Sequence, residues 1–205
     1  MESRRVEALA DGVFAVAMTL LVLGVHVPEL PEPVTGAALL AALRTLVPSL
    51  AGYAVGFLLL GTLLLGHHNQ FRFIRRADRT LLWINLFFLL AVASVPFTTA
   101  LIARYPLQPV AMAIFGGTLL VAGVFLFAHW SHAVNAGLVD DEVTPEAAEL
   151  VRERMSMAMV ACLVATIIGA FLPKAGLVLF GCMPVLSMLP GRVDPALAGE
   201  ASTTD

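Results

Sequence analysis

Long apolar segments recur along this chain between short polar connections, and their lengths predict an all-α membrane protein. The segments cover about residues 8–27, 46–66, 81–103, 108–132, 155–172 and 174–190. An α-helix rises about 1.5 Å per residue, so about 20 apolar residues cross a hydrocarbon core of about 30 Å. We therefore expect an integral membrane bundle of six transmembrane helices.

The same pattern indicates one membrane domain over residues 1–191, closed by Pro190-Gly191. Residues 192–205 are small and polar, and we expect them to form a short disordered cytoplasmic tail. Between the fourth and fifth segments, Thr144 before Pro145 and Glu146 predicts a helix start. That helix is expected to continue into the fifth segment.

Composition supports the membrane assignment. Hydrophobic residues make up 59% of the 205 residues and charged residues only 13%, whereas a soluble domain has about 25% charged residues.

A secretory signal peptide is an alternative for the first segment, but Asp11 interrupts its start and the apolar run exceeds the usual length of about 7–15 residues. Without a basic domain or an aromatic-basic motif, nucleic-acid binding is not expected.

The distribution of Lys and Arg predicts the orientation. An even number of spans puts both termini on one side, and that side carries Arg4, Arg5, Arg72, Arg75, Arg76, Arg79, Arg152, Arg154 and Arg192. The other side carries Arg44, Arg104 and Lys174. Because positively charged connections stay inside, we expect a multi-pass protein of the cell membrane with both termini in the cytoplasm.

The first segment has a continuous helical stripe. Helical spacing aligns Val16, Thr19, Leu20, Leu23 and Val27. On residue type alone, this stripe either packs against other helices or lines a symmetry axis. Asp11 lies on a different face, and an ionisable group near the end of a spanning helix is costly enough to suggest a function.

Polar residues gather at the cytoplasmic ends of the first three spans. They are Arg5, Asp11, His67, His68 and Asn85. Polar groups at membrane depth need partners, so we expect Arg5, Asp11 and Asn85 to form a network with one of the two histidines. The network either ties the helices together or contains a proton relay.

Other chemistry has little support. His129 and His132 have the spacing of two metal ligands on a helix, but no third ligand accompanies them. Cys162 and Cys182 lie in apolar runs and read as small core residues. Hydrolase, zinc-protease, phosphate-loop and dinucleotide motifs do not occur. We expect no enzyme activity, no metal site and no cofactor.

Three sets of residues in the first three spans carry a family resemblance. They are Arg5 and Asp11, the histidine of the second span, and Asn85-Leu-Phe-Phe-Leu-Leu with Pro96-Phe97. Over about residues 5–105 the chain resembles prokaryotic members of the transmembrane protein 175 family of potassium channels. The family pattern has Phe-Ser before the aspartate, where this chain has Leu9-Ala10.

The resemblance implies a homotetramer in the lipid bilayer that passes monovalent cations, with K⁺ expected in the pore. Four first helices would line that pore without a re-entrant filter loop. By position, Val16, Thr19, Leu20 and Leu23 would form its constriction rings, and Arg5, Asp11, His67 and Asn85 would hold the first helix to its neighbours. The alternative is a small proton-coupled membrane transporter with Asp11 and a histidine as its relay.

Overall fold

The structure is a computed structural model, and it describes residues 3–187. It is all-helical, as the sequence predicts. The helices are α1 (Ser3–Leu23), α2 (Gly36–Thr45), α3 (Val47–Phe71), α4 (Arg79–Arg104), α5 (Pro109–Asn135), α6 (Pro145–Phe171) and α7 (Pro173–Ser187). Apart from isolated bridge residues, among them Ile74 paired with Val139, these residues form no β-structure.

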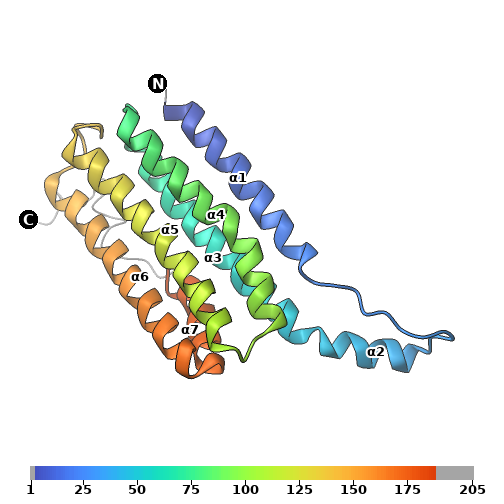
Figure 1. The fold of residues 1–205 in the computed structure, drawn as a ribbon. Coiled ribbons are helices and arrows are strands. Elements are labelled where there is room, and N and C mark those ends of the chain that lie inside the picture. Colours follow the sequence, from blue (N-terminus) through green and yellow to red (C-terminus); the bar gives the residue numbers. More distant parts are fainter. Residues whose placement is uncertain (1–2, 188–205) are drawn as a thin grey trace, which may run out of the picture.

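Five of the helices are long and apolar enough to cross a membrane: α1, α3, α4, α5 and α6. They lie side by side in one bundle (Figure 1). The described part of the sixth predicted span is α7, an apolar helix of 15 residues. The end of that span, 188–190, and the tail, 192–205, lie outside the described residues, so both expectations remain predictions.

Helix α2 is an element that the apolar pattern did not predict. It follows the proline-rich connection after α1 and projects from the bundle (Figure 1). Its N-cap is Thr35, whose side chain accepts a hydrogen bond from the Ala38 N–H. Ala and Leu, which are strong helix formers, fill most of its sequence, and none of its residues is buried. The helix therefore forms from local preference and capping rather than from packing.

Capping residues set the ends of two spanning helices. The Thr144 side chain accepts from the Ala147 N–H at 3.2 Å, which confirms the predicted helix start. The Asp78 carboxylate accepts from the Leu81 N–H at 2.7 Å and starts α4.

Helix α3 continues beyond the predicted end near residue 66 to Phe71, so its polar residues His67 and Gln70 remain helical.

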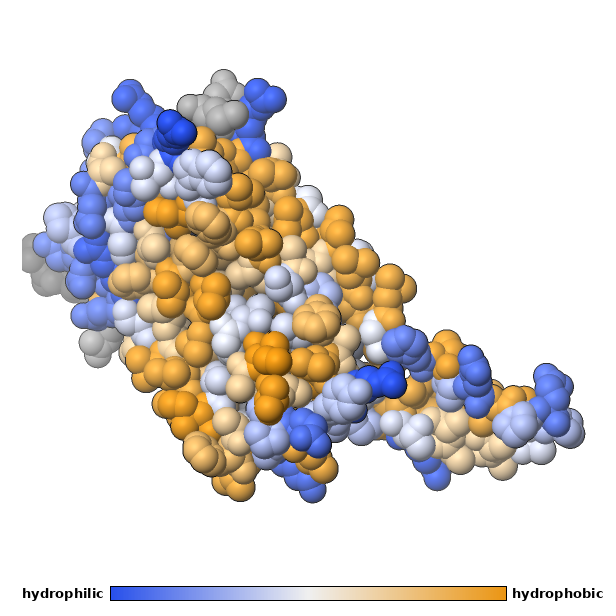
Figure 2. Space-filling model, viewed as in Figure 1, coloured by the Kyte–Doolittle hydropathy of each residue, from blue (hydrophilic) through white to orange (hydrophobic). Residues whose placement is uncertain are grey.

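Helix α4 is the centre of the bundle. It packs against α1, α3 and α5, and α5 in turn packs against α6. The core contains fully buried Phe88, Val92 and Phe115. In contrast, large apolar side chains such as Leu90 and Val110 are exposed. In Figure 2, apolar residues cover most of the visible bundle surface and hydrophilic residues gather toward its ends, as expected for a surface in contact with lipid.

Prediction: Gly116→Ala should destabilise the bundle, whereas Gly117→Ala should not. A Cβ at Gly116 would collide with the side chain of Thr166, while a Cβ at Gly117 would meet nothing within 4 Å. Overpacking of this kind costs about 1–3 kcal/mol, and a helical Gly→Ala change without a clash gains up to about 1 kcal/mol. Thermal unfolding of the two variants in detergent measures the difference. Equal melting temperatures would contradict this α5–α6 packing.

Candidate functional site

Helix α1 has one buried face and one exposed face. The buried face consists of Val6, Ala10, Phe14, Ala17 and Leu21, which follow helical spacing and pack toward α3 and α4. On the other face, Val16 is 58% exposed, Leu20 45% and Leu23 69%. The rest of the described chain therefore covers only one side of its first helix.

Phe14 fixes the rotation of α1 about its axis. Its ring is fully buried, with its centroid 5.9 Å from that of Phe88 on α4 and 6.3 Å from that of His67 on α3. Farther along, the Leu21 side chain approaches Gly56 of α3. Because these contacts lie on one face of α1, the opposite face must point away from the bundle.

The exposed face carries most of the stripe expected from the sequence; Val27 is not part of it, because α1 ends at Leu23 rather than at the predicted residue 27. Val16, Thr19, Leu20 and Leu23 are all exposed on it. By helical spacing, Leu9 and Gly12 extend the same stripe toward the N-terminus, and both are exposed. The sequence analysis did not include these two residues, although the i, i+3, i+4 spacing marks them. The structure leaves the stripe free to meet another molecule or another copy of this chain.

Thr19 is the one polar residue among the four stripe residues expected to form rings. Its hydroxyl donates to the carbonyl oxygens of Ala15 at 3.0 Å and Val16 at 2.9 Å. A hydroxyl that donates to its own helix still has lone pairs. Thr19 can therefore present an acceptor oxygen on this otherwise apolar face.

Of the predicted polar network, the structure brings together His67 and Asn85. His67 Nε2–H donates to Asn85 Oδ1 at 2.8 Å, and both side chains are almost completely buried. The His67 ring also stacks on Phe88 at a centroid separation of 5.2 Å. This pair joins α3 to α4 directly behind Phe14.

The other three predicted members lie elsewhere. His68 faces α1, where its Nδ1 is 3.0 Å from Oε1 of Glu7. Arg5 and Asp11 are exposed on α1, and neither forms a side-chain hydrogen bond or ion pair in the part of this chain that the structure describes, although Asp11 is near enough to His67 to interact with it electrostatically. The described residues of this chain therefore do not assemble the full network by hydrogen bonds.

A second buried polar pair was missed by the sequence analysis. His129 Nδ1–H donates to Gln70 Oε1 at 2.8 Å, and Gln70 Nε2 donates to the Leu126 carbonyl oxygen at 3.1 Å. His132 turns away to Asp78, at 2.8 Å. A glutamine within an apolar helix signals a buried partner, but the sequence does not reveal which one. Within residues 3–187, no group of three or more potential ligands could hold a metal ion.

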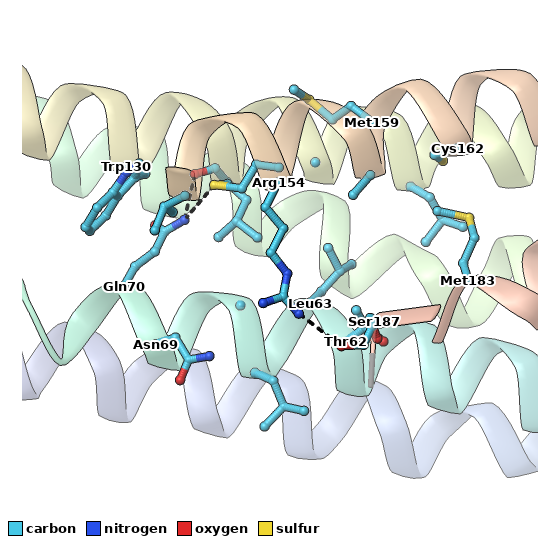
Figure 3. Close-up of a pocket in the computed structure, with 18 of the residues that line it drawn as sticks. Thr62, Leu63, Asn69, Gln70, Trp130, Arg154, Met159, Cys162, Met183 and Ser187 are labelled. Atoms are coloured by element: carbon cyan, nitrogen blue, oxygen red, sulfur yellow. Dashed lines mark hydrogen bonds between the residues drawn. The ribbon is translucent and has the colours of Figure 1, made fainter. Parts of the chain in front are cut away.

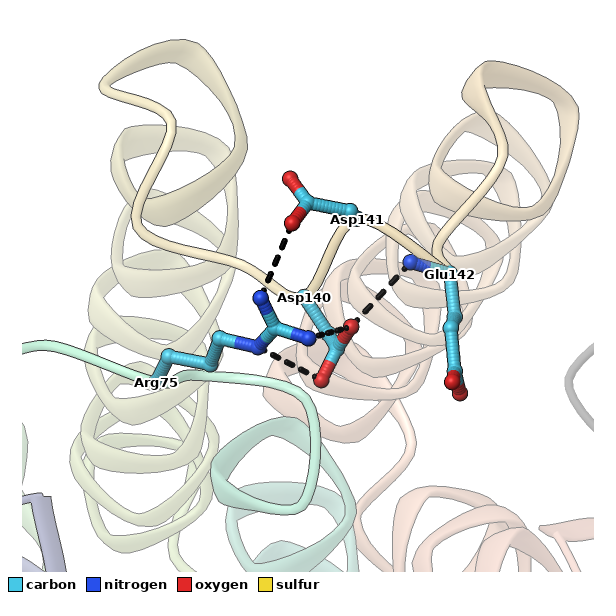
Figure 4. Close-up of polar contacts among 4 residues, drawn as sticks. All are labelled: Arg75, Asp140, Asp141 and Glu142. Atoms are coloured by element: carbon cyan, nitrogen blue, oxygen red, sulfur yellow. Dashed lines mark hydrogen bonds and ion pairs between the residues drawn. The ribbon is translucent and has the colours of Figure 1, made fainter.

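Arg75 links two connections at the end of the bundle where α3 ends and α4 begins (Figure 4). Its guanidinium donates to both carboxylate oxygens of Asp140 and to Asp141, at 2.5–2.9 Å. The pKa of Asp140 is lowered, first by the Glu142 N–H and then by Arg75, and Asp140 raises the pKa of Arg75. This clamp joins the α3–α4 connection to the α5–α6 loop and lies apart from the α1 stripe.

Comparisons with known proteins relate this arrangement to a family of channels. The family model described as the endosomal/lysosomal potassium channel TMEM175 matches residues 5–96. A Streptomyces collinus protein named a potassium channel is 38% identical, over 76% of this chain and 77% of that protein. The crystal structure of a lysosomal potassium-selective channel TMEM175 homolog from Chamaesiphon minutus matches with a TM-score of 0.76 and 28% identity, over 91% of this chain and 98% of that one.

The name of a mouse relative refers to a different ion. The endosomal/lysosomal proton channel TMEM175 of Mus musculus is 30% identical over 65% of this chain, a region that covers 29% of the mouse protein. The names of these similar proteins thus include both potassium and proton channels.

Prediction: Asn85→Ala should lower thermal stability, because it leaves the buried His67 N–H without an acceptor. An unsatisfied buried polar group costs about 1–3 kcal/mol. Asn69→Ala is the matched control, since Asn69 lies two residues after His67 on α3 and is exposed. Substitution of an exposed residue usually changes the free energy of unfolding by no more than about 0.5 kcal/mol. Melting temperatures in the same detergent decide the matter, and equal losses for the two variants would contradict the role of the His67–Asn85 bond.

Proposed function

Because this chain belongs to the TMEM175 family of ion channels, we propose that it is a potassium channel whose pore is formed by the α1 helices of a homotetramer. Similar proteins of Streptomyces collinus and Chamaesiphon minutus are named potassium channels. As a multi-pass membrane protein rather than an enzyme, it would pass monovalent cations. The excess of Arg at one end favours cytoplasmic termini.

The exposed face of α1 carries this proposal. Phe14 and Leu21 bind one face of the helix to its own subunit, and Val16, Leu20 and Leu23 point away from it. Four such faces around a symmetry axis would cover one another and enclose a narrow apolar path. The alternative use of the stripe, packing on other helices of the same subunit, has no support in the fold, because these residues remain exposed.

The stripe suggests how the pore controls ion flow. Rings of Val16, Leu20 and Leu23 would exclude water and thereby form a barrier to hydrated ions, which dilation or rotation of α1 would remove. The Thr19 hydroxyls would supply weak oxygen ligands within the dry region. Since side chains rather than a cage of carbonyl oxygens would contact the ion, selectivity among monovalent cations should be modest.

Proton conduction is a second candidate, because the mouse relative is named a proton channel. Flux measurements with K⁺ gradients and with proton gradients separate the two ions. The transporter alternative differs from both, since it requires saturable uptake that depends on a substrate.

Prediction: Val16→Ala should increase passive K⁺ flux into liposomes, because it widens the proposed constriction. The increase should be about tenfold if the ring contributes on the order of 1.4 kcal/mol to the barrier. Val22→Ala is the matched control, since Val22 is 49% exposed on another face of α1. Equal effects of the two variants would contradict the assignment of the pore face.

Prediction: Asp11→Asn or Arg5→Ala should loosen the tetramer without changing ion preference. In the proposed assembly, these exposed charged groups find partners on a neighbouring subunit, while His67 and Asn85 hold α3 to α4 behind the pore helix. Native mass spectrometry measures the tetramer, and reversal potentials measure selectivity. A change in selectivity with the tetramer intact would show that these residues act on the ion instead.

A further inference from the structure

The connection between α3 and α4 is the most basic stretch of the described chain. Residues 72–79 contain four arginines and a single acidic residue, Asp78. That carboxylate is already bound, because it accepts from the Leu81 N–H at the start of α4 and lies 2.8 Å from His132 Nε2. The connection lies at the end of the bundle where α1 begins (Figure 1). It therefore presents positive charge beside several helices of membrane-spanning length.

Three of these four arginines are exposed and unpaired. Arg75 binds carboxylates of the α5–α6 loop (Figure 4). In contrast, Arg72, Arg76 and Arg79 form no hydrogen bond or ion pair within residues 3–187. The Arg72 guanidinium lies 6.0 Å from the centroid of the Phe73 ring, a contact that leaves its N–H groups available to an anion. Together the three residues form an arginine cluster.

The arginines of α6 differ, because each of them is bound within the chain. Arg152 donates to Glu149 at 3.2 Å. Arg154 lies in the pocket lined by α3, α5, α6 and α7, where it donates to the Ser187 carbonyl oxygen (Figure 3). The described carboxylates that pair with an arginine therefore pair with Arg75 or Arg152, and none of them neutralises the arginine cluster.

Helix α4 continues from the arginine cluster with an exposed face that suits a lipid chain. Helical spacing places Trp83, Phe87 and Leu90 on the same face as Arg79, and these three side chains are 52%, 46% and 64% exposed. Tryptophan is enriched where lipid head groups meet the hydrocarbon. Because Arg79 lies one helical turn of about 6 Å beyond Trp83, its guanidinium can reach the level of the lipid phosphates.

We infer that anionic phospholipids of the bilayer bind here, with the phosphate at the arginine cluster and one acyl chain along Trp83, Phe87 and Leu90. A guanidinium presents its N–H groups in a fork that matches phosphate oxygens. Basic clusters directly beside a membrane-spanning helix attract anionic lipids, and each basic residue strengthens binding about fivefold. The inference does not rest on the proposed ion conduction, because lipid binding to the purified protein is measured without any flux.

Native mass spectra of the purified full-length protein test the head-group contact. Phosphatidylglycerol and phosphatidylcholine with identical acyl chains are supplied in equal amounts, and wild type should retain phosphatidylglycerol in preference. Each of Arg72→Gln, Arg76→Gln and Arg79→Gln should lower that preference about fivefold, and the triple variant should lower it further. Arg152→Gln is the matched control and should leave the preference unchanged, since it removes a charge that Glu149 already binds.

Three results would overturn the inference. Wild type could retain the two lipids equally. The triple variant could keep the wild-type preference, as it would if a neighbouring subunit covered the cluster. Inorganic phosphate could displace phosphatidylglycerol where sodium chloride of equal ionic strength does not, which would assign the cluster to soluble phosphate. Elution volume and melting temperature show whether each variant is folded, and the single variants decide if the triple variant is not.

Trp83→Ala tests the acyl-chain contact. It removes apolar surface beside the head group, so it should lower retention of both lipids severalfold while their ratio stays the same. Phe97→Ala is the matched control, because Phe97 is 69% exposed on the same face of α4 but lies about 21 Å farther along the helix. It should not alter retention of phosphatidylglycerol at the cluster. Loss of retention in both variants, or in neither, would overturn the proposed path of the acyl chain.

Discussion

The burial of Phe14 is the constraint on which the rest of the arrangement depends. This ring packs against Phe88 and His67, and it lies on the same face of α1 as Ala10, Ala17 and Leu21. A helix held along one face has a fixed rotation, so its other face has a fixed direction. The apolar stripe through Val16 is exposed because the opposite face of α1, which carries Phe14, is buried.

Two buried polar pairs stabilise the packing of α3, α4 and α5, the helices behind α1. The hydrogen bond between His67 and Asn85 joins α3 to α4, and that between His129 and Gln70 joins α5 to α3. In an apolar surrounding, a broken pair leaves costly unsatisfied groups, so such bonds fix the positions of the helices. The charged groups of α1 differ, because Arg5 and Asp11 are exposed and form no hydrogen bond or ion pair within the described chain. The pore proposal gives them partners in a neighbouring subunit.

The sequence predicts those features that depend on local patterns. The lengths of the apolar segments predicted the spanning helices, and helical spacing predicted the stripe on α1. The capping residue Thr144 predicted the start of α6. It did not predict α2, because a short Ala/Leu helix lacks both the length of a span and a buried face. Nor could it choose His67 over His68 or match His129 with Gln70, because such pairs depend on the packing of helices distant in sequence.

The central claim is that the Val16 face of α1 lines a pore. Modification of cysteines tests it most directly, in a background where Cys162 and Cys182 are replaced by serine. A membrane-impermeant cationic thiosulfonate is applied to Leu23→Cys and Val22→Cys channels during K⁺ flux; these neighbouring residues are both exposed but lie on different faces. The account predicts a loss of flux for Leu23→Cys and little change for Val22→Cys. Block at Val22 with none at Leu23 would contradict it.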